Sequence, residues 1–156
     1  MQHSNLSFKR VRCLGLSMSN EALIDKLNEA LGWELRAISQ YAHYAAYIRG
    51  IHRFQLSPHF ASEATESMAH ADVVRASIVK LGGIAVTDRN PKPIEHTTDY
   101  RIMLQHSLDT ETTASKVYAE ALELVEASGD SDLYDAIEQI YLAEVRSVEE
   151  LRLLVE

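Results

Sequence analysis

Apolar residues recur at spacings of three and four along four stretches of the chain, a pattern typical of helices with one buried face. The stretches cover residues 19–49, 58–81, 98–128 and 131–155. Ser57 precedes Pro58 and is expected to cap the second helix, since proline is favoured in a first helical turn. The sequence therefore predicts four helices of similar length.

The connection between the second and third helices is unusually long. It runs from Gly82 to Thr97, contains Pro91 and Pro93, and has no apolar periodicity. Its sixteen residues can span about 50 Å, against about 37 Å for a 25-residue helix. The other connections are short, so neighbouring helices should pair antiparallel. We expect an all-α fold, a four-helix bundle with one long crossover between helices two and three.

The amino-acid composition supports an all-α protein and limits the kinds of partner that it is expected to bind. The chain of 156 residues is 46% hydrophobic, with three prolines and six glycines, which excludes collagen-like, disordered and most all-β proteins. A formal charge of −8 argues against nucleic acids and acidic membranes and favours cations. A single cysteine excludes an intrachain disulfide or a cysteine-built cluster. No apolar run reaches membrane-spanning length, so we expect a cytoplasmic protein.

The first residues differ in charge from the rest. The first twenty contain Lys9, Arg10 and Arg12 and no acidic residue. Residues 1–18 are therefore interpreted as a basic N-terminal extension, and residues 19–156 as the bundle. Three explanations of the extension stay open: a mistaken start upstream of Met18, an arm that contacts a partner, or a segment packed on the domain.

The apolar residues predicted to form the buried face of each helix make a stripe along it. Each of the four apolar stripes contains one strongly polar residue, and these four residues are expected near mid-height of the bundle. They are Glu34, His70, Glu111 and Glu144. Three carboxylates and an imidazole cannot all stay charged and unpaired in an apolar interior, because desolvating an ion costs several kcal/mol. A metal ion is expected between them, and this donor set suits iron, manganese or zinc. The alternative is a metal-free network of these side chains with arginine.

Two segments, residues 27–41 and 68–72, resemble the first two helices of bacterioferritins, which belong to the ferritin-like superfamily. The 36-residue separation of Glu34 and His70 also matches that family. The resemblance implies a ferritin-like fold in which Glu34 and Glu111 are terminal iron ligands, His70 is the ligand of helix two, and Glu144 is a bridging carboxylate.

The chain departs from the family pattern at two ligand positions. Ser67 stands where a second bridging glutamate is expected, and Ser147 where a second histidine is expected. One metal ion held by Glu34, His70 and Glu144 is therefore the expectation, rather than a symmetric di-iron centre. Two interpretations of Glu63 and Glu66 stay open: substitute metal ligands, or ordinary solvent-facing or cage-lining acids.

Two further residues take roles from the resemblance. Tyr41 matches a tyrosine beside the di-iron site, where it would hydrogen-bond a ligand or give up an electron; the alternative is a core tyrosine. Met68 matches a haem-ligating methionine on a two-fold dimer surface, and the alternative is a methionine that fills an interface. The histidines expected on the surface are His43, His52, His59, His96 and His106.

These observations favour an iron-binding protein for iron storage and homeostasis, with ferroxidase activity weakened or lost. A second hypothesis is a non-catalytic ferritin-like subunit that partners an active paralogue. A third, a mini-ferritin that shields DNA, has only the basic extension in its favour. The chain ends near the close of helix four with no clear fifth helix, so a 24-subunit cage is less expected. A homodimer or larger homo-oligomer is expected through helices one and two, along an apolar strip formed by Tyr44, Tyr47, Met68 and Val73.

Overall fold

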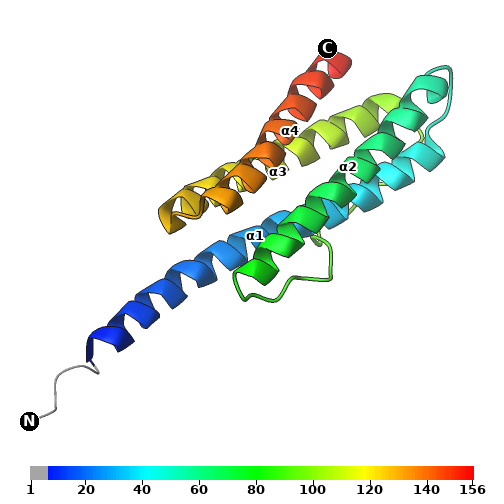
Figure 1. The fold of residues 1–156 in the computed structure, drawn as a ribbon. Helices are drawn as coiled ribbons and strands as arrows, with labels where there is room; N and C mark the ends of the chain where they lie inside the picture. The colour runs from blue at the N-terminus through cyan, green and yellow to red at the C-terminus, as the bar shows by residue number, and fades with distance from the viewer. Residues whose placement is uncertain (1–6) are drawn as a thin grey trace, which may run out of the picture.

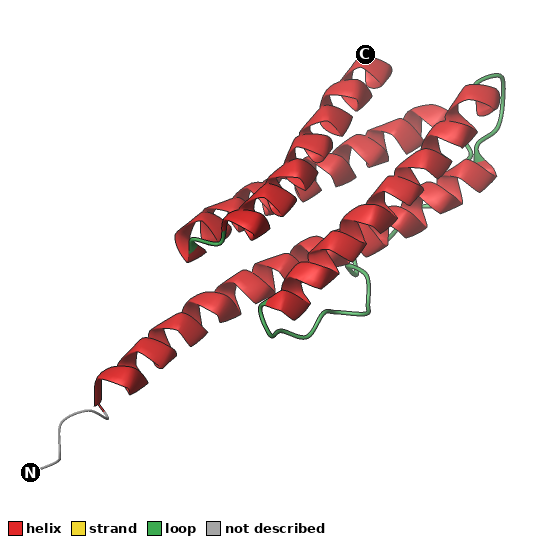
Figure 2. Ribbon diagram, in the orientation of Figure 1, coloured by secondary structure: helices red, strands yellow, loops and turns green. Residues whose placement is uncertain are grey.

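The computed structural model describes the backbone of residues 7–156 and the side chains from residue 20 onward. Helices account for most of this part of the chain, and it contains no strand (Figure 2). The helices are α1 (Ser7–Tyr47), α2 (Arg53–Lys80), α3 (Tyr100–Ser128) and α4 (Ser131–Val155). The prediction of an all-α four-helix protein is confirmed.

The helices form two antiparallel hairpins, α1–α2 and α3–α4, joined by the crossover (Figure 1). Besides the contacts within each hairpin, α1 packs along α3, whereas α2 and α4 touch over a much smaller area. The beginning of α1 runs past the end of the bundle (Figure 1). No described helix is long and apolar enough to cross a membrane.

Helices α1 and α2 begin earlier than predicted. Helix α2 starts at Arg53, so Pro58 lies inside it, and Ser57 is not its cap. The Ser57 hydroxyl instead donates to the backbone oxygen of Ala45 at 2.7 Å, which ties the two helices together. Helix α1 starts at Ser7 because no proline interrupts residues 7–19. The expected boundary at residue 18 stays a prediction, and residues 1–6 of the extension lie outside the described residues.

The ends of α3 and α4 lie within two residues of the predicted ones. Asp99 caps α3 by accepting a hydrogen bond from the Arg101 amide at 2.8 Å, and Asp130 caps α4 in the same way from Leu133 at 3.0 Å. Gly129 ends α3 with a φ of 74°, a left-handed conformation that glycine adopts without strain. The short α3–α4 connection is thereby fixed.

The crossover lies along α1, fastened at intervals by hydrogen bonds. The Val86 amide donates to the Asn28 side chain at 2.8 Å, and the Asn90 amide donates to the Gly32 carbonyl at 2.8 Å. One turn further on, the buried guanidinium of Arg36 donates to two crossover carbonyl oxygens at 3.0 and 2.8 Å. These bonds satisfy backbone groups in a segment without secondary structure.

The interior consists of two apolar clusters. One contains Leu27, Leu31, Val74 and Ile137 among its residues, and the other is built around Tyr41, Phe60 and Leu104. On every helix the boundary between the clusters falls at the single polar residue predicted to face inward. We call this boundary the polar layer, and it holds the candidate site.

Candidate metal centre

Each helix contributes one side chain to the polar layer: Glu34 from α1, His70 from α2, Glu111 from α3 and Glu144 from α4. The three glutamates are 2%, 4% and 3% exposed, respectively. The His70 side chain is 13% exposed. The expectation that one polar residue of each stripe faces inward at a common level therefore agrees with the structure.

The His70 ring lies between two carboxylates. Its Nδ1 atom is 3.0 Å from Glu144 Oε1 and 3.3 Å from Glu34 Oε1. One ligand atom of each of these three residues lies within 4.8 Å of the others, which is close enough for all three to bind one ion. Three convergent ligands with an imidazole among them are a common arrangement for a first-row transition metal.

Two tyrosines fix the carboxylates that come from α1 and α3. The Tyr118 hydroxyl donates to Glu34 Oε1 at 2.6 Å, and the Tyr41 hydroxyl donates to Glu111 Oε1. Each tyrosine stands seven residues after the glutamate of its own helix and bonds the glutamate of the other helix. Tyr118 was not predicted as a site residue; its position two turns beyond Glu111 on the same apolar stripe was the signal available.

Electrostatics show that the layer lacks positive charge. Burial, followed by the charge of Glu111, raises the pKa of Glu144 well above its usual range, and burial also raises the pKa of Glu111. Burial lowers the pKa of His70, but the hydrogen bond and charge of Glu34, together with the charges of Glu66 and Glu111, outweigh it, so the net shift is upward. Protons therefore supply part of the charge that a metal ion would bring.

One buried atom points to a missing partner. Glu144 Oε2 is inaccessible to solvent and has no hydrogen-bond partner. A buried acceptor without a partner costs about 1–3 kcal/mol. The donor set and this orphaned oxygen fit a single metal ion bound by Glu34, His70 and Glu144.

The neighbouring acids lie outside the group of three. Glu66 Oε1 is 3.7 Å from His70 Nε2, on the side of the ring away from the other ligands, and its side chain is 46% exposed. Glu63 is half-buried, and burial followed by the charge of Glu111 raises its pKa to about 7. Ser67, the residue after Glu66, is buried. A second bridging carboxylate is not among the three convergent ligands.

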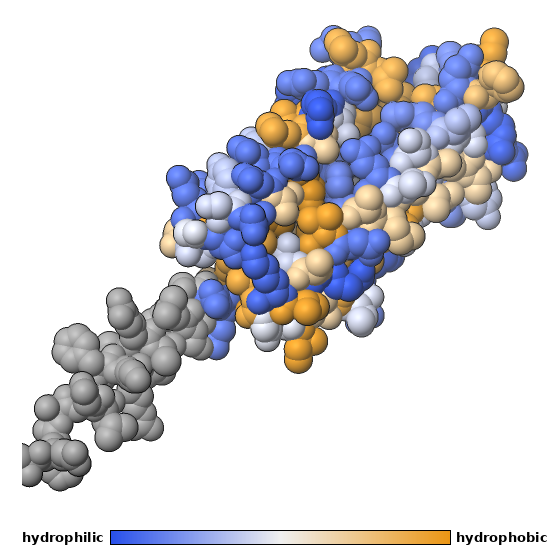
Figure 3. Space-filling model, viewed as in Figure 1, coloured by the Kyte–Doolittle hydropathy of each residue, from blue (hydrophilic) through white to orange (hydrophobic). Residues whose placement is uncertain are grey.

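Other predicted residues are distributed as follows. Met68 is 52% exposed on α2, and Tyr47 and Val73 are also exposed. On the face drawn in Figure 3, exposed hydrophobic residues lie between hydrophilic ones. Tyr44, expected on the same strip, is instead buried, because its hydroxyl finds partners in His106 Nδ1 and the Glu95 carbonyl. His52 and His96 are exposed as predicted, whereas His43, His59 and His106 are half-buried.

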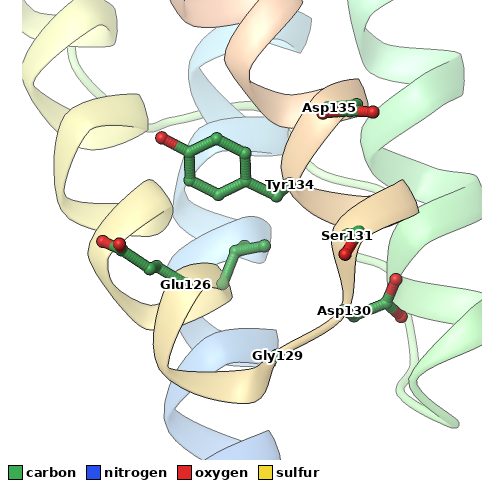
Figure 4. Close-up of a pocket in the computed structure, with 7 residues that line it drawn as sticks. Glu126, Gly129, Asp130, Ser131, Tyr134 and Asp135 are labelled. Carbon is green, nitrogen blue, oxygen red and sulfur yellow. The ribbon is translucent and has the colours of Figure 1, made fainter.

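A hollow at the α3–α4 turn, about 300 Å³ in volume, does not form a second centre (Figure 4). Among the residues that line it, the carboxylates of Glu126, Asp130 and Asp135 point in different directions (Figure 4). Asp130 is already committed to the α4 cap and to Lys80, whose Nζ lies 2.8 Å from it. The acidic side chains that line this hollow therefore do not converge on one ion.

Fold and site together define a four-helix bundle with carboxylate and histidine ligands at its centre. The family model of the ferritin-like domain matches residues 24–156, and the chain belongs to this family. The comparison with curated proteins finds no match.

Solved structures give the same assignment. A ferritin-like diiron-carboxylate protein from Bacillus anthracis is 31% identical, with a TM-score of 0.84 over 88% of this chain and 98% of the other. The bacterioferritin of Rhodobacter capsulatus is 28% identical, with a TM-score of 0.75 over 86% and 84%. A dodecameric thioferritin from Bacteroides fragilis, related to bacterioferritin, is 26% identical, with a TM-score of 0.78 over 85% and 83%. The chain is bacterioferritin-like.

Proposed function

We propose that this protein binds ferrous iron, or another divalent transition-metal ion, through Glu34, His70 and Glu144 and serves iron storage and homeostasis. The observation that carries the proposal is the convergence of two buried carboxylates and the half-buried His70 imidazole, with one ligand atom of each within 4.8 Å of the others. The similarity to a diiron-carboxylate protein supports iron as the ion. Glu111 supplies further negative charge to the layer.

We further propose that ferroxidase activity is weakened or lost. Two-metal chemistry requires a pair of ions bridged a few ångströms apart. The resemblance to bacterioferritins implies a bridging glutamate at Ser67 and a histidine at Ser147, and a serine hydroxyl replaces neither. Tyr41, the expected redox or hydrogen-bonding tyrosine, donates a hydrogen bond to Glu111 and so positions the carboxylate that lies outside the group of three ligands.

The remaining ligand geometry depends on this chain's own side chains. Tyr118 holds Glu34 toward the interior, and the apolar clusters on both sides exclude water from the carboxylates. His70 is the most exposed of the three ligands, so an entering ion would contact it first. Iron would supply the redox chemistry of any oxidation step.

Assembly and haem binding are extensions of the same proposal. The thioferritin neighbour is dodecameric, and the exposed side chains of Tyr47, Met68 and Val73 support a homodimer or larger homo-oligomer of this chain. The Rhodobacter capsulatus bacterioferritin contains haem iron. Met68 is exposed on α2 and would hold haem at such an interface, which a Soret band lost in Met68→Ala would reveal.

The test is metal content with a matched histidine control. Purified protein is loaded with Fe(II) without oxygen, dialysed and analysed for iron, alongside His70→Ala and His52→Ala. The wild type and His52→Ala should retain about one ion per chain, and His70→Ala should lose most of it. Equal content in all three proteins would show that bound iron lies elsewhere.

Exposure of the loaded protein to air tests the second part. Ferric absorbance that rises no faster than in buffer is expected from an incomplete centre. Rapid oxygen-dependent oxidation would refute the loss of ferroxidase activity. Absence of any bound iron would instead favour a structural subunit that partners an active paralogue.

A further inference from the structure

A pair of imidazoles lies outside the polar layer, where the end of the crossover meets α1. His43 Nε2 of α1 and His96 Nδ1 of the crossover are 3.0 Å apart. Neither residue takes part in the candidate metal centre, and the proposed function does not use them. The two rings come from segments separated by 53 positions in the sequence, so only the fold brings them together.

The distance between these nitrogens is that of two ligands on one ion. Two nitrogens at about 2.1 Å from an ion, with 90° between the bonds, lie about 3.0 Å from each other. A single proton shared between the rings gives the same spacing, so a metal ion can take its place with little movement of either residue. The outward side is open, because His96 is exposed, and water can complete the coordination.

The rings are also held in place by their surroundings. The Tyr47 ring lies 4.4 Å from the His43 ring and 4.7 Å from the His96 ring, measured between centroids. His43 is half-buried on α1, and the next crossover residue back, Glu95, accepts a hydrogen bond from Tyr44 through its carbonyl oxygen. Little conformational freedom is left to lose on binding, which favours affinity.

We infer that His43 and His96 form a surface site for a divalent ion that prefers imidazole ligands at 90° to each other, such as nickel or copper. The bound ion joins the end of the crossover to α1, beyond the hydrogen bonds that the crossover donates to Asn28 and Gly32 and accepts from Arg36. It therefore acts as a clip that keeps the crossover on the helix. The site is independent of the ligands in the polar layer.

Equilibrium dialysis against nickel tests the inference, with His43→Ala, His96→Ala and the exposed control His52→Ala. The wild type and His52→Ala should bind one more nickel ion per chain than either of the other variants. His96→Ala changes an exposed loop residue, so it keeps the test informative if His43→Ala folds poorly. Equal nickel binding by His96→Ala and the wild type would overturn the inference.

Thermal unfolding gives a second measurement. Nickel should raise the unfolding temperature of the wild type by more than that of His96→Ala, because the clip is missing in the variant. An equal rise in both would also overturn the site. The difference between the two proteins does not depend on the polar layer, since both retain Glu34, His70 and Glu144, so failure of the proposed function would leave it unchanged.

Discussion

Replacing Glu144 by glutamine should stabilise the metal-free protein. Glu144 is buried with Glu34 and Glu111, and its pKa is raised well above the usual range by burial and by the Glu111 charge. When the pKa of a carboxyl is raised in the folded state, the free energy of unfolding falls as the pH rises above the pKa of that carboxyl in the unfolded chain. Glu144 therefore destabilises the folded protein at neutral pH. Each pKa unit corresponds to about 1.4 kcal/mol. Glutamine has a similar shape and no charge, and we expect the free energy of unfolding to rise by at least about 1 kcal/mol.

The same substitution should remove the stabilisation that metal provides. A ligand at a hundred times its dissociation constant stabilises the folded state by about 2.7 kcal/mol. Urea unfolding is measured for wild type and Glu144→Gln, with chelator and with zinc, which does not change oxidation state. The variant should be the more stable protein with chelator and should gain much less from zinc. A variant that is less stable with chelator, or gains as much from zinc as the wild type, would refute the reasoning.

Three further predictions concern the site and one helix end. Tyr118→Phe removes the donor to a buried carboxylate and should cost about 1.5–3 kcal/mol in urea unfolding and weaken metal binding. The matched control Tyr134→Phe, at a half-buried tyrosine of α4 that packs against the first apolar cluster, should change neither. Metal affinity, measured by calorimetry, should fall from neutral to mildly acidic pH, because His70 and Glu144 have raised pKa values and must release protons to bind; affinity that is constant with pH would contradict this. Gly129→Ala places a side chain at a φ of 74° and should lower the free energy of unfolding by about 1–2 kcal/mol with metal content unchanged.

The sequence was informative where local periodicity decides the structure. Four helices follow from four apolar stripes, and Glu34, His70, Glu111 and Glu144 stood out because each is the one strongly polar residue on its stripe. Counting along each helix then placed them at one height, as found. The end of α3 at residue 128 and the start of α4 at residue 131 were also predicted, and the structure shows local caps at both, Gly129 and Asp130.

Contacts between distant segments were harder to predict. Tyr118 looked like an ordinary core residue, because its role depends on Glu34, 84 positions away in the sequence. Tyr44 looked like a surface tyrosine until the crossover supplied partners for its hydroxyl. Pro58 indicated a helix start, but α2 begins at Arg53, and the Ser57 hydroxyl bonds the Ala45 carbonyl of α1 instead of capping α2. In each case tertiary packing overrides the local signal.

The uneven packing of the helices gives the bundle a closed edge and an open edge. Helices α1 and α3 pack closely, and the crossover strengthens that side by its bonds to α1, whereas α2 and α4 meet only sparsely. The two hairpins are therefore held together mainly along α1 and α3. The contact between His70 and Glu144 spans the open edge between α2 and α4. An ion bound by His70 and Glu144 would therefore link α2 to α4 along the edge where the two hairpins are least packed against each other.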